Sequence, residues 1–495
     1  MNARLVSVGI ILTTAAAVVA FAAPDMRVGP RTAVAATTTP VPDGILARGK
    51  IDRVVVVVME NRTFDNIFGG VASSSPAPYP GADSSVPPSV VPMMNSASFV
   101  GTSNTNNFYN VYRCVANGGF SSTAWQGVAT SPLPCSGWHF GKVANPFWFL
   151  AEEDRRVYWE IAHDYELGDA FFAPTATDSY PAHQYIVAGQ SRDTIRFGNS
   201  VIHDTIADET YYGTTKNYPA GCADLGVHPS PPILVPALGP SPSPWASPTM
   251  RGTEGECYDV PTFAEILNQA AHRRPGLITW QQFATVTAQP LPLHDEQPFN
   301  GFINIRNWWN HRWAPSGKYV LNVAKHGAMP SFSWVKPPCV DASDHPGTGD
   351  GGPSWVKDIV NALGSNEAQW DRSVIFVVWD DWGGLYDHVT PPSPRPWDNM
   401  GPGLRTPFLV ISPYVARGKV AHGVADYGSV MRFVEDLFGT GRLGTLDAHA
   451  PDLTGVFDFT HRRVFEPLGA KPPITWEAAC TKTPSPLVSP TPFRD

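Results

Sequence analysis

The sequence predicts an α/β protein with a mostly parallel central sheet flanked by helices, and three observations support this. The apolar run from Val54 to Met59 has no polar face, which indicates a strand buried on both sides, as in parallel sheets. Apolar segments of similar character recur at 373–379 and 407–411. Segments with helical spacing of apolar residues, at 152–163 and 428–438, lie between or after them. Strands that alternate with helices form a layered α/β fold.

The N-terminal region is expected to be a secretory signal peptide covering residues 1–23. One positive residue precedes an apolar stretch from Leu5 to about Ala20, and small residues follow it. The stretch is too short and too rich in alanine for a stable membrane span, and a retained anchor is the alternative. We therefore expect a secreted, periplasmic or cell-surface protein, with a tether over residues 24–50.

The main domain is predicted over residues 51–470, with loop insertions near 71–140 and 205–260 and a Pro/Ser-rich tail at 471–495. A chain of 495 residues is long enough for one large core with insertions. Its 50 prolines and 43 glycines indicate long loops, which is where binding and catalytic residues concentrate.

Charge and cysteine content exclude several classes. A net charge of -9, without any run of Lys or Arg, argues against a nucleic-acid partner. Six cysteines, with no CxxC pair, fit disulfides in an oxidising compartment better than a zinc ribbon. Pairing by proximity joins Cys114 to Cys135 and Cys222 to Cys257, which leaves Cys339 for Cys480. Because six cysteines allow fifteen pairings, other connectivities stay open.

Two predicted strands end in oxygen-bearing side chains. Glu60 and Asn61 follow the first, and Asp380 and Asp381 follow the strand at 373–379. Ligands gather at such strand ends, and crowded carboxylates require a cation or a shifted pKa. We therefore expect a divalent metal ion, with magnesium, calcium, manganese and zinc all open. Taken alone, Glu60 and Asn61 have a second interpretation as the cap of a turn.

Other polar residues near these segments are weaker candidates by themselves. Ser179 lies in a turn beside a proline, and an ordinary surface serine is the simpler interpretation because no GxSxG elbow is present. His345 ends a loop stiffened by prolines, where a positioned histidine can bind an anionic oxygen or protonate a leaving alkoxide. His294 forms a similar couple with Asp295, and a structural role is equally compatible with it.

Five segments together resemble the bacterial phosphoesterase family that holds phospholipases C and acid phosphatases. In chain order they are ENRTFDNIFGG, DSYPAHQYIVAGQS, SWVKPPCVDASDHP, WDDWGGLYDHVTPP and LRTPFLVISPYVARGKVAH. The resemblance runs from about residue 51 to about residue 465. It implies an alkaline-phosphatase-like fold and metal-dependent cleavage of phosphoric esters through a phosphorylated serine or threonine.

The resemblance also implies roles for single residues. Ser179 takes the position of the nucleophile, and His345 that of the histidine contacting the phosphoryl group. The metal ligands are Glu60, Asn61, Asp380 and Asp381. The residues that we expect to contact and orient these groups are Asp344, Asp387, His388 and His183. Family members commonly carry a further histidine in an early loop; no histidine precedes His139 here, so His139 or His294 is the candidate replacement.

The expected partner is a phosphate ester, either a small phosphomonoester or a phospholipid head group. A sulfatase is disfavoured because the chain lacks a CxPxR sequence that a formylglycine requires. The alternative from a different class is a catalytically impaired, secreted, metal-binding envelope protein of the same fold. The missing early histidine is the feature that favours it.

Overall fold

The structure is a computed structural model, and it describes the parts of the chain that carry the predicted strands and most of the predicted site. The described residues are 47–69, 94–96, 148–176, 179–191, 193–197, 200–207, 233–234, 260–284, 301–302, 305–308, 311, 313–346, 350–393, 395 and 401–481. They all belong to one compact unit, which spans residues 37–495. The predicted signal peptide, almost all of the tether, most of both insertions and the end of the tail lie outside the described residues.

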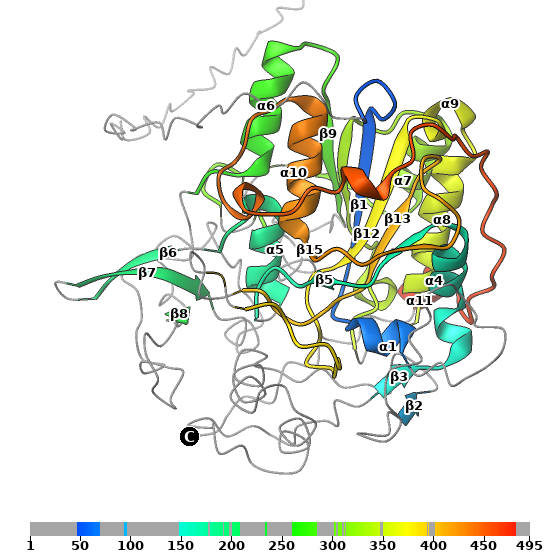
Figure 1. Cartoon of the computed structure of the whole chain (residues 1–495), viewed down its shortest axis with the longest axis horizontal. Coiled ribbons are helices and arrows are strands. Elements are labelled where there is room, and N and C mark those ends of the chain that lie inside the picture. Colours follow the sequence, from blue (N-terminus) through cyan, green and yellow to red (C-terminus); the bar gives the residue numbers. More distant parts are fainter. Residues whose placement is uncertain are drawn as a thin grey trace, which may run out of the picture. The chain divides into compact units, whose positions relative to one another are not determined.

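An eight-stranded sheet forms the core, with β1 (Arg53–Met59) and β12 (Ser373–Trp379) side by side near its middle (Figure 1). All residues from Val54 to Met59 are fully buried, which explains why that segment has no polar face. The sheet order is β10 (Ala314–Pro315), β9 (Trp280–Ala284), β11 (Phe332–Val335), β1, β12, β13 (Phe408–Ile411), β4 (Glu166–Gly168) and β14 (Lys419–Ala421).

The sheet is mostly parallel, as predicted. Neighbours from β10 to β12 pair in parallel, and so do β4 and β14. The exception is β13, which pairs antiparallel with both β12 and β4. The expected layered α/β fold is therefore confirmed, with one reversed strand that the apolar pattern of residues 407–411 does not reveal.

Helices cover both faces of the sheet (Figure 1). One group comprises α5 (Ser179–Ala188), α6 (Phe263–Arg273) and α10 (Tyr427–Phe438). The other comprises α4 (Glu152–Asp164), α7 (Lys318–Lys325), α8 (Gly352–Gly364) and α9 (Glu367–Trp370). None of the helices in the described parts of the chain is both long and apolar enough to cross a bilayer.

Short elements complete the described structure. Two-stranded sheets join β2 (Met94–Ser96) to β3 (Trp148–Leu150) and β5 (Phe171–Phe172) to β15 (Ala425–Asp426). A three-stranded sheet contains β6 (Asp193–Phe197), β7 (Ser200–Ala207) and β8 (Ile233–Leu234). The remaining helices are α1 (Phe64–Phe68), α11 (Trp476–Thr481) and the 3-10 turns η4 (Val340–Ala342), η5 (Leu446–Ala448) and η6 (Thr454–Val456).

A disulfide joins Cys339 to Cys480 across 141 residues of sequence, as the proximity argument left them. Cys339 precedes η4, and Cys480 lies in α11, so the bridge ties the segment after β11 to the last described helix. The other four cysteines, with their two predicted pairs, lie outside the described residues.

Candidate active site

The register of β1 and β12 delivers two polar pairs to one place. Met59 lies opposite Trp379 in the parallel pairing, so the two residues that follow each strand leave the sheet at the same edge. Backbone contacts continue beyond the strands, because the Asp380 amide donates to the Met59 carbonyl oxygen at 3.0 Å. All four side chains are buried: Glu60, Asn61, Asp380 and Asp381.

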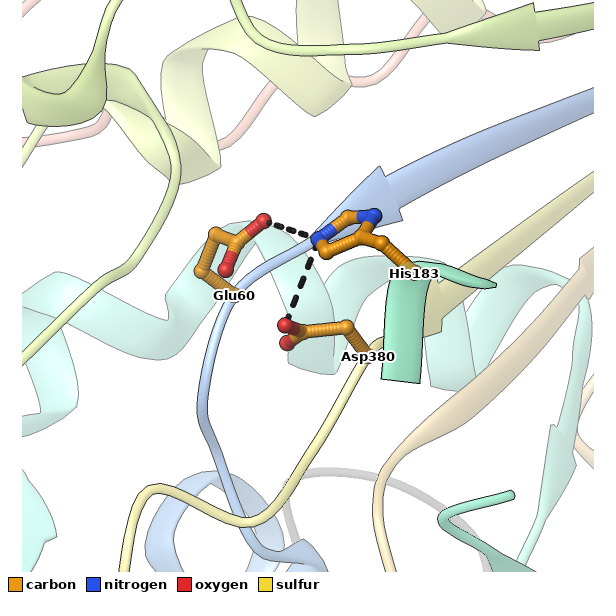
Figure 2. A group of neighbouring side chains, drawn as sticks. All are labelled: Glu60, His183 and Asp380. Atoms are coloured by element: carbon orange, nitrogen blue, oxygen red, sulfur yellow. Dashed lines mark hydrogen bonds and ion pairs between the residues drawn. The ribbon is translucent and has the colours of Figure 1, made fainter. Parts of the chain in front are cut away.

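Helix α5 presents two side chains to these pairs. Ser179, its first residue, places Oγ 2.8 Å from both Asn61 Oδ1 and Asp381 Oδ2. His183, one turn later on the same helix face, places Nε2 2.9 Å from Glu60 Oε1 and 3.3 Å from Asp380 Oδ2 (Figure 2). The serine thus meets the second member of each pair, and the histidine meets the first.

Ser179 begins a ten-residue helix rather than lying in the predicted turn. Pro181 is compatible with this, because a proline in the first turn removes an amide that has no partner within the helix. The N-terminus of a helix favours negative charge through its dipole and its unpaired amides. The position of Ser179 therefore suits a hydroxyl that is to lose its proton or carry an anionic group.

The first members of the two pairs, Glu60 and Asp380, influence each other's pKa. Burial, reinforced by Asp380, raises the pKa of Glu60 well above its ordinary value. Burial acts in the same direction on Asp380, but hydrogen bonds from His183 and from the Asn61 amide outweigh it and lower the pKa of Asp380 to about 2. In the metal-free protein, Asp380 therefore loses its proton at lower pH than Glu60 does.

The donor set of this site fits a divalent cation. Three carboxylates, one amide oxygen and one hydroxyl converge from β1, β12 and α5. Hard oxygen ligands of this kind suit magnesium, calcium or manganese. Like charges at this spacing repel strongly, so the neighbouring Asp380 favours a proton on Glu60. A bound cation would take the place of that proton.

A lysine that the sequence analysis did not single out lies behind this group. Lys336 follows β11 directly, and its Nζ is 2.5 Å from His183 Nδ1. Burial, together with the charge of Lys336, lowers the pKa of His183 to about 4. The available signal was a lysine placed directly after a buried strand, at the same sheet edge as the two polar pairs.

The loop that carries His345 is anchored to the same edge. The Glu60 amide donates to the Ser343 carbonyl oxygen at 2.8 Å, and Arg62 Nε donates to the Asp344 carbonyl oxygen at 2.7 Å. His345 Nδ1 lies 2.9 Å from the Pro346 carbonyl oxygen, so Nδ1 carries a proton. Burial lowers the pKa of His345 to about 4.

Backbone strain concentrates at this edge. Among the described residues, the non-glycine positions with positive φ are Asn61, at 50°, and Asp344, at 75°. Asp344 Oδ2 accepts hydrogen bonds from Tyr158 OH at 2.6 Å and from Trp379 Nε1 at 3.1 Å, which hold it in place. Such conformations persist only where surrounding contacts enforce them, and they cluster at functional sites.

Gly383 allows the chain after β12 to pass close to Asn61. Its φ is 63°, and a Cβ atom added there would lie 2.4 Å from the Asn61 carbonyl oxygen. A side chain at this position would therefore displace the backbone that carries the amide ligand. Glycine permits both this conformation and this close approach because it has no Cβ atom.

The chain matches a known protein family over most of its length. A profile of the phosphoesterase family matches residues 51–441. The chain belongs to the phosphoesterase family. The family resemblance inferred from the five sequence segments is thereby confirmed.

Several proteins similar to this chain are named as phospholipases C. A non-hemolytic phospholipase C of Burkholderia pseudomallei is 22% identical over 432 residues, which is 78% of this chain and 55% of that protein. A hemolytic phospholipase C of Pseudomonas aeruginosa is 32% identical over 159 residues, or 27% of this chain and 22% of the relative. Phospholipase C B of Mycobacterium tuberculosis is 30% identical over 176 residues, or 30% of this chain and 34% of the relative. The matches thus span between 22% and 55% of these relatives' lengths.

A second polar cluster braces the loops that follow β1 and β12. Arg405 Nη2 donates to Asp65 Oδ1 at 2.9 Å, and its Nε donates to Asp387 Oδ1 at 3.1 Å. His388 Nδ1 lies 2.8 Å from Asp65 Oδ2. Asp387 and His388 therefore belong to this brace, and the supporting role expected of them stays a prediction. Asp65 and Arg405 lie in two of the five sequence segments, but neither was predicted to take part in the site.

The structure brings most of the predicted site together. Ser179 lies among the four predicted metal ligands, with His183 beside it, and the loop of Asp344 and His345 is hydrogen-bonded to the same edge. His294 and His139 lie outside the described residues, so the replacement for the early-loop histidine stays a prediction.

Proposed function

We propose that this protein is a metal-dependent phosphoric ester hydrolase that forms a phosphoserine at Ser179. The observation that carries the proposal is the position of Ser179 Oγ, 2.8 Å from an amide oxygen and a carboxylate oxygen of two separate strand ends. Membership of the phosphoesterase family supports the reaction class. Relatives named phospholipase C favour a phosphodiester of the phospholipid type as substrate.

The ligand set proposed for the divalent cation is Glu60, Asn61, Asp380 and Asp381. A bound cation would lower the pKa of the Ser179 hydroxyl and neutralise charge on a phosphoryl oxygen. Ser179 Oγ attacks phosphorus, the bond from phosphorus to the ester oxygen breaks, and the released oxygen takes up a proton. Asp381 Oδ2 lies 2.8 Å from Oγ and is placed to accept the serine proton.

In the second step, water attacks phosphorus and the Ser179 oxygen leaves with a proton. His345 is neutral near pH 7, because burial lowers its pKa to about 4, and its Nδ1 proton is engaged with the Pro346 carbonyl oxygen. A neutral ring with this tautomer favours accepting a proton from the attacking water over protonating the leaving group. The amides at the start of α5 stabilise the phosphoryl charge in both steps.

One assay tests the reaction and ranks the substrates. The full chain, stripped of metal with a chelator, is supplied with magnesium, calcium, manganese or zinc and then with p-nitrophenyl phosphorylcholine or p-nitrophenyl phosphate. Metal-dependent release of nitrophenol, faster from the diester, is expected. Faster release from the monoester would assign a phosphatase. Metal binding without any release would instead favour the impaired envelope protein.

The Asp380→Asn variant tests the ligand assignment. It removes one carboxylate from the donor set and should weaken metal affinity by about 10-fold or more. Asp371→Asn is the matched control, because Asp371 precedes β12 at the opposite end of that strand. Unchanged metal affinity and activity in Asp380→Asn would show that the ion, if bound, lies elsewhere.

Export is part of the proposal. The predicted signal peptide at residues 1–23 and the Cys339–Cys480 disulfide both suit an oxidising compartment. Mass spectrometry of the protein recovered from outside the cytoplasm should find an N-terminus near residue 24, and an intact N-terminus in the cytoplasm would refute it.

A further inference from the structure

Lys336 and His183 form a buried pair next to two carboxylates of the site, Glu60 and Asp380. Lys336 is 4% exposed and His183 is fully buried. Lys336 Nζ lies 2.5 Å from His183 Nδ1, while His183 Nε2 lies between Glu60 Oε1 and Asp380 Oδ2 (Figure 2). The contacts thus run from the end of β11 through α5 to the ends of β1 and β12.

This arrangement fixes which ring nitrogen of His183 carries the proton. An ammonium group has three donors and no acceptor, so the Nδ1 atom that meets it must present its lone pair. A neutral imidazole that accepts at Nδ1 carries its proton at Nε2. The Nε2 proton then points at Glu60 Oε1, which accepts it at 2.9 Å, and Asp380 Oδ2 lies 3.3 Å from the same nitrogen.

A protonated ring nitrogen cannot bind a metal ion. Glu60, His183 and Asp380 lie close enough together to hold an ion as a group of three. With Lys336 in place, however, His183 acts toward the carboxylates as a hydrogen-bond donor. The ligand atoms that remain available to a cation are then oxygen atoms. Without Lys336, the ring could carry its proton at Nδ1 and offer the Nε2 lone pair to an ion.

We propose that Lys336 is a positioning residue that sets the metal selectivity of the site by holding His183 as a donor. The inference rests on the proposed metal site. Oxygen-only sites suit magnesium, calcium and manganese, whereas an imidazole ligand favours zinc. Glu60, Asp380 and Asp381 together with the Lys336 ammonium have a formal charge that one divalent cation balances, and this balance is the same for zinc and for manganese, so the selectivity depends on the His183 proton alone.

The test compares the affinities of the metal-free full chain for zinc and for manganese. Lys336→Met should raise the ratio of zinc to manganese affinity by about 10- to 100-fold, the range that outer contacts of a metal ligand command. The double variant Lys336→Met/His183→Phe should return the ratio to the wild-type value, because the added nitrogen ligand is gone. Lys357→Met is the matched control, since Lys357 Nζ donates to the Ala470 carbonyl oxygen away from the site.

Each outcome has one meaning. An unchanged ratio in folded Lys336→Met, or a raised ratio that survives in the double variant, would overturn the inference. Failure of the wild-type chain to bind either ion would instead refute the proposed metal site.

A second measurement reports directly on the atoms bound to the metal ion. Pulsed electron paramagnetic resonance of the manganese-loaded chain should show no directly bound imidazole nitrogen from His183. A nitrogen signal that is present in the wild type and lost in His183→Phe would overturn the inference.

Discussion

Met59 of β1 lies directly opposite Trp379 of β12 in a parallel pair, and this register determines the composition of the site. Because both strands end at the same level, the next two residues of each chain segment face each other. Two residues of α5, one turn apart, then meet these pairs: the serine contacts one member of each pair and the histidine contacts the other.

Replacing Ser179 by alanine should abolish turnover while the fold and metal binding are retained. The change removes the proposed nucleophile, so kcat should fall by roughly 10³-fold or more. Ser412→Ala is a suitable control, because that buried hydroxyl donates to the Ser373 carbonyl oxygen at 2.9 Å in the sheet. Turnover within tenfold of wild type in Ser179→Ala would point to a water nucleophile instead.

Metal binding should release a proton at mildly acidic pH. Burial and Asp380 hold the pKa of Glu60 well above 4.5, so Glu60 is protonated until the pH exceeds that raised value. A cation must displace this proton, so affinity should rise with pH and level off above the Glu60 pKa. Calorimetry at pH 5, just above the ordinary glutamate pKa, in buffers of different ionisation enthalpy would count the proton. Glu60→Gln should lose this pH dependence; its persistence would assign the proton elsewhere.

Replacing Arg405 by methionine should destabilise the protein strongly. Arg405 bridges Asp65 and Asp387, and its loss would leave two buried carboxylates without their shared cation, at about 3–5 kcal/mol. Arg417→Met is the control: its exposed side chain pairs with Asp164 at 2.9 Å, and such pairs contribute about 0–1 kcal/mol. Urea unfolding curves measure both, and equal losses would contradict the brace.

Removing the Cys339–Cys480 bridge should lower stability and loosen the segment that leads to His345. A loop of this length is expected to contribute about 2–5 kcal/mol to the free energy of unfolding. The variant with both cysteines changed to serine should also show faster amide hydrogen exchange near η4, because that segment loses its attachment to α11. Unchanged exchange there would mean that packing alone holds the loop.

Asp154→Asn should remove a pH-dependent loss of stability. Burial raises the pKa of Asp154 from 3.8 to about 7, and its Oδ2 atom has no hydrogen-bond partner among the described residues. Between these two values the folded state holds a proton that the unfolded state has lost, so wild-type stability falls as pH rises. Unfolding at pH 5 and pH 8 should show a difference that shifts in favour of the variant at the higher pH. A constant difference would contradict the shifted pKa.

The two strand ends were predictable because each is a buried apolar run followed directly by a carboxylate, a change that is visible in the sequence. This is why the sequence alone singled out residues 60, 61, 380 and 381, which the structure places at one sheet edge, together with the α/β class. The reversed direction of β13 was not predictable, since an apolar run of four residues reads the same in both directions. Lys336 and Arg405 were missed for a related reason: their partners come from distant segments, and only tertiary structure brings them together.

The five consecutive valines of β1 have a consequence for how the sheet aligns. Identical side chains do not specify the register of the strand, because a shift by one residue leaves a valine at nearly every position. The unique contacts lie at the two ends, where the Asp52 and Arg53 amides donate to the Arg372 carbonyl oxygen and the Glu60 amide donates to Ser343. A single residue inserted in the run would therefore put Met59 or Glu60 in its neighbour's place, so this strand should tolerate exchange of side chains far better than any change of length.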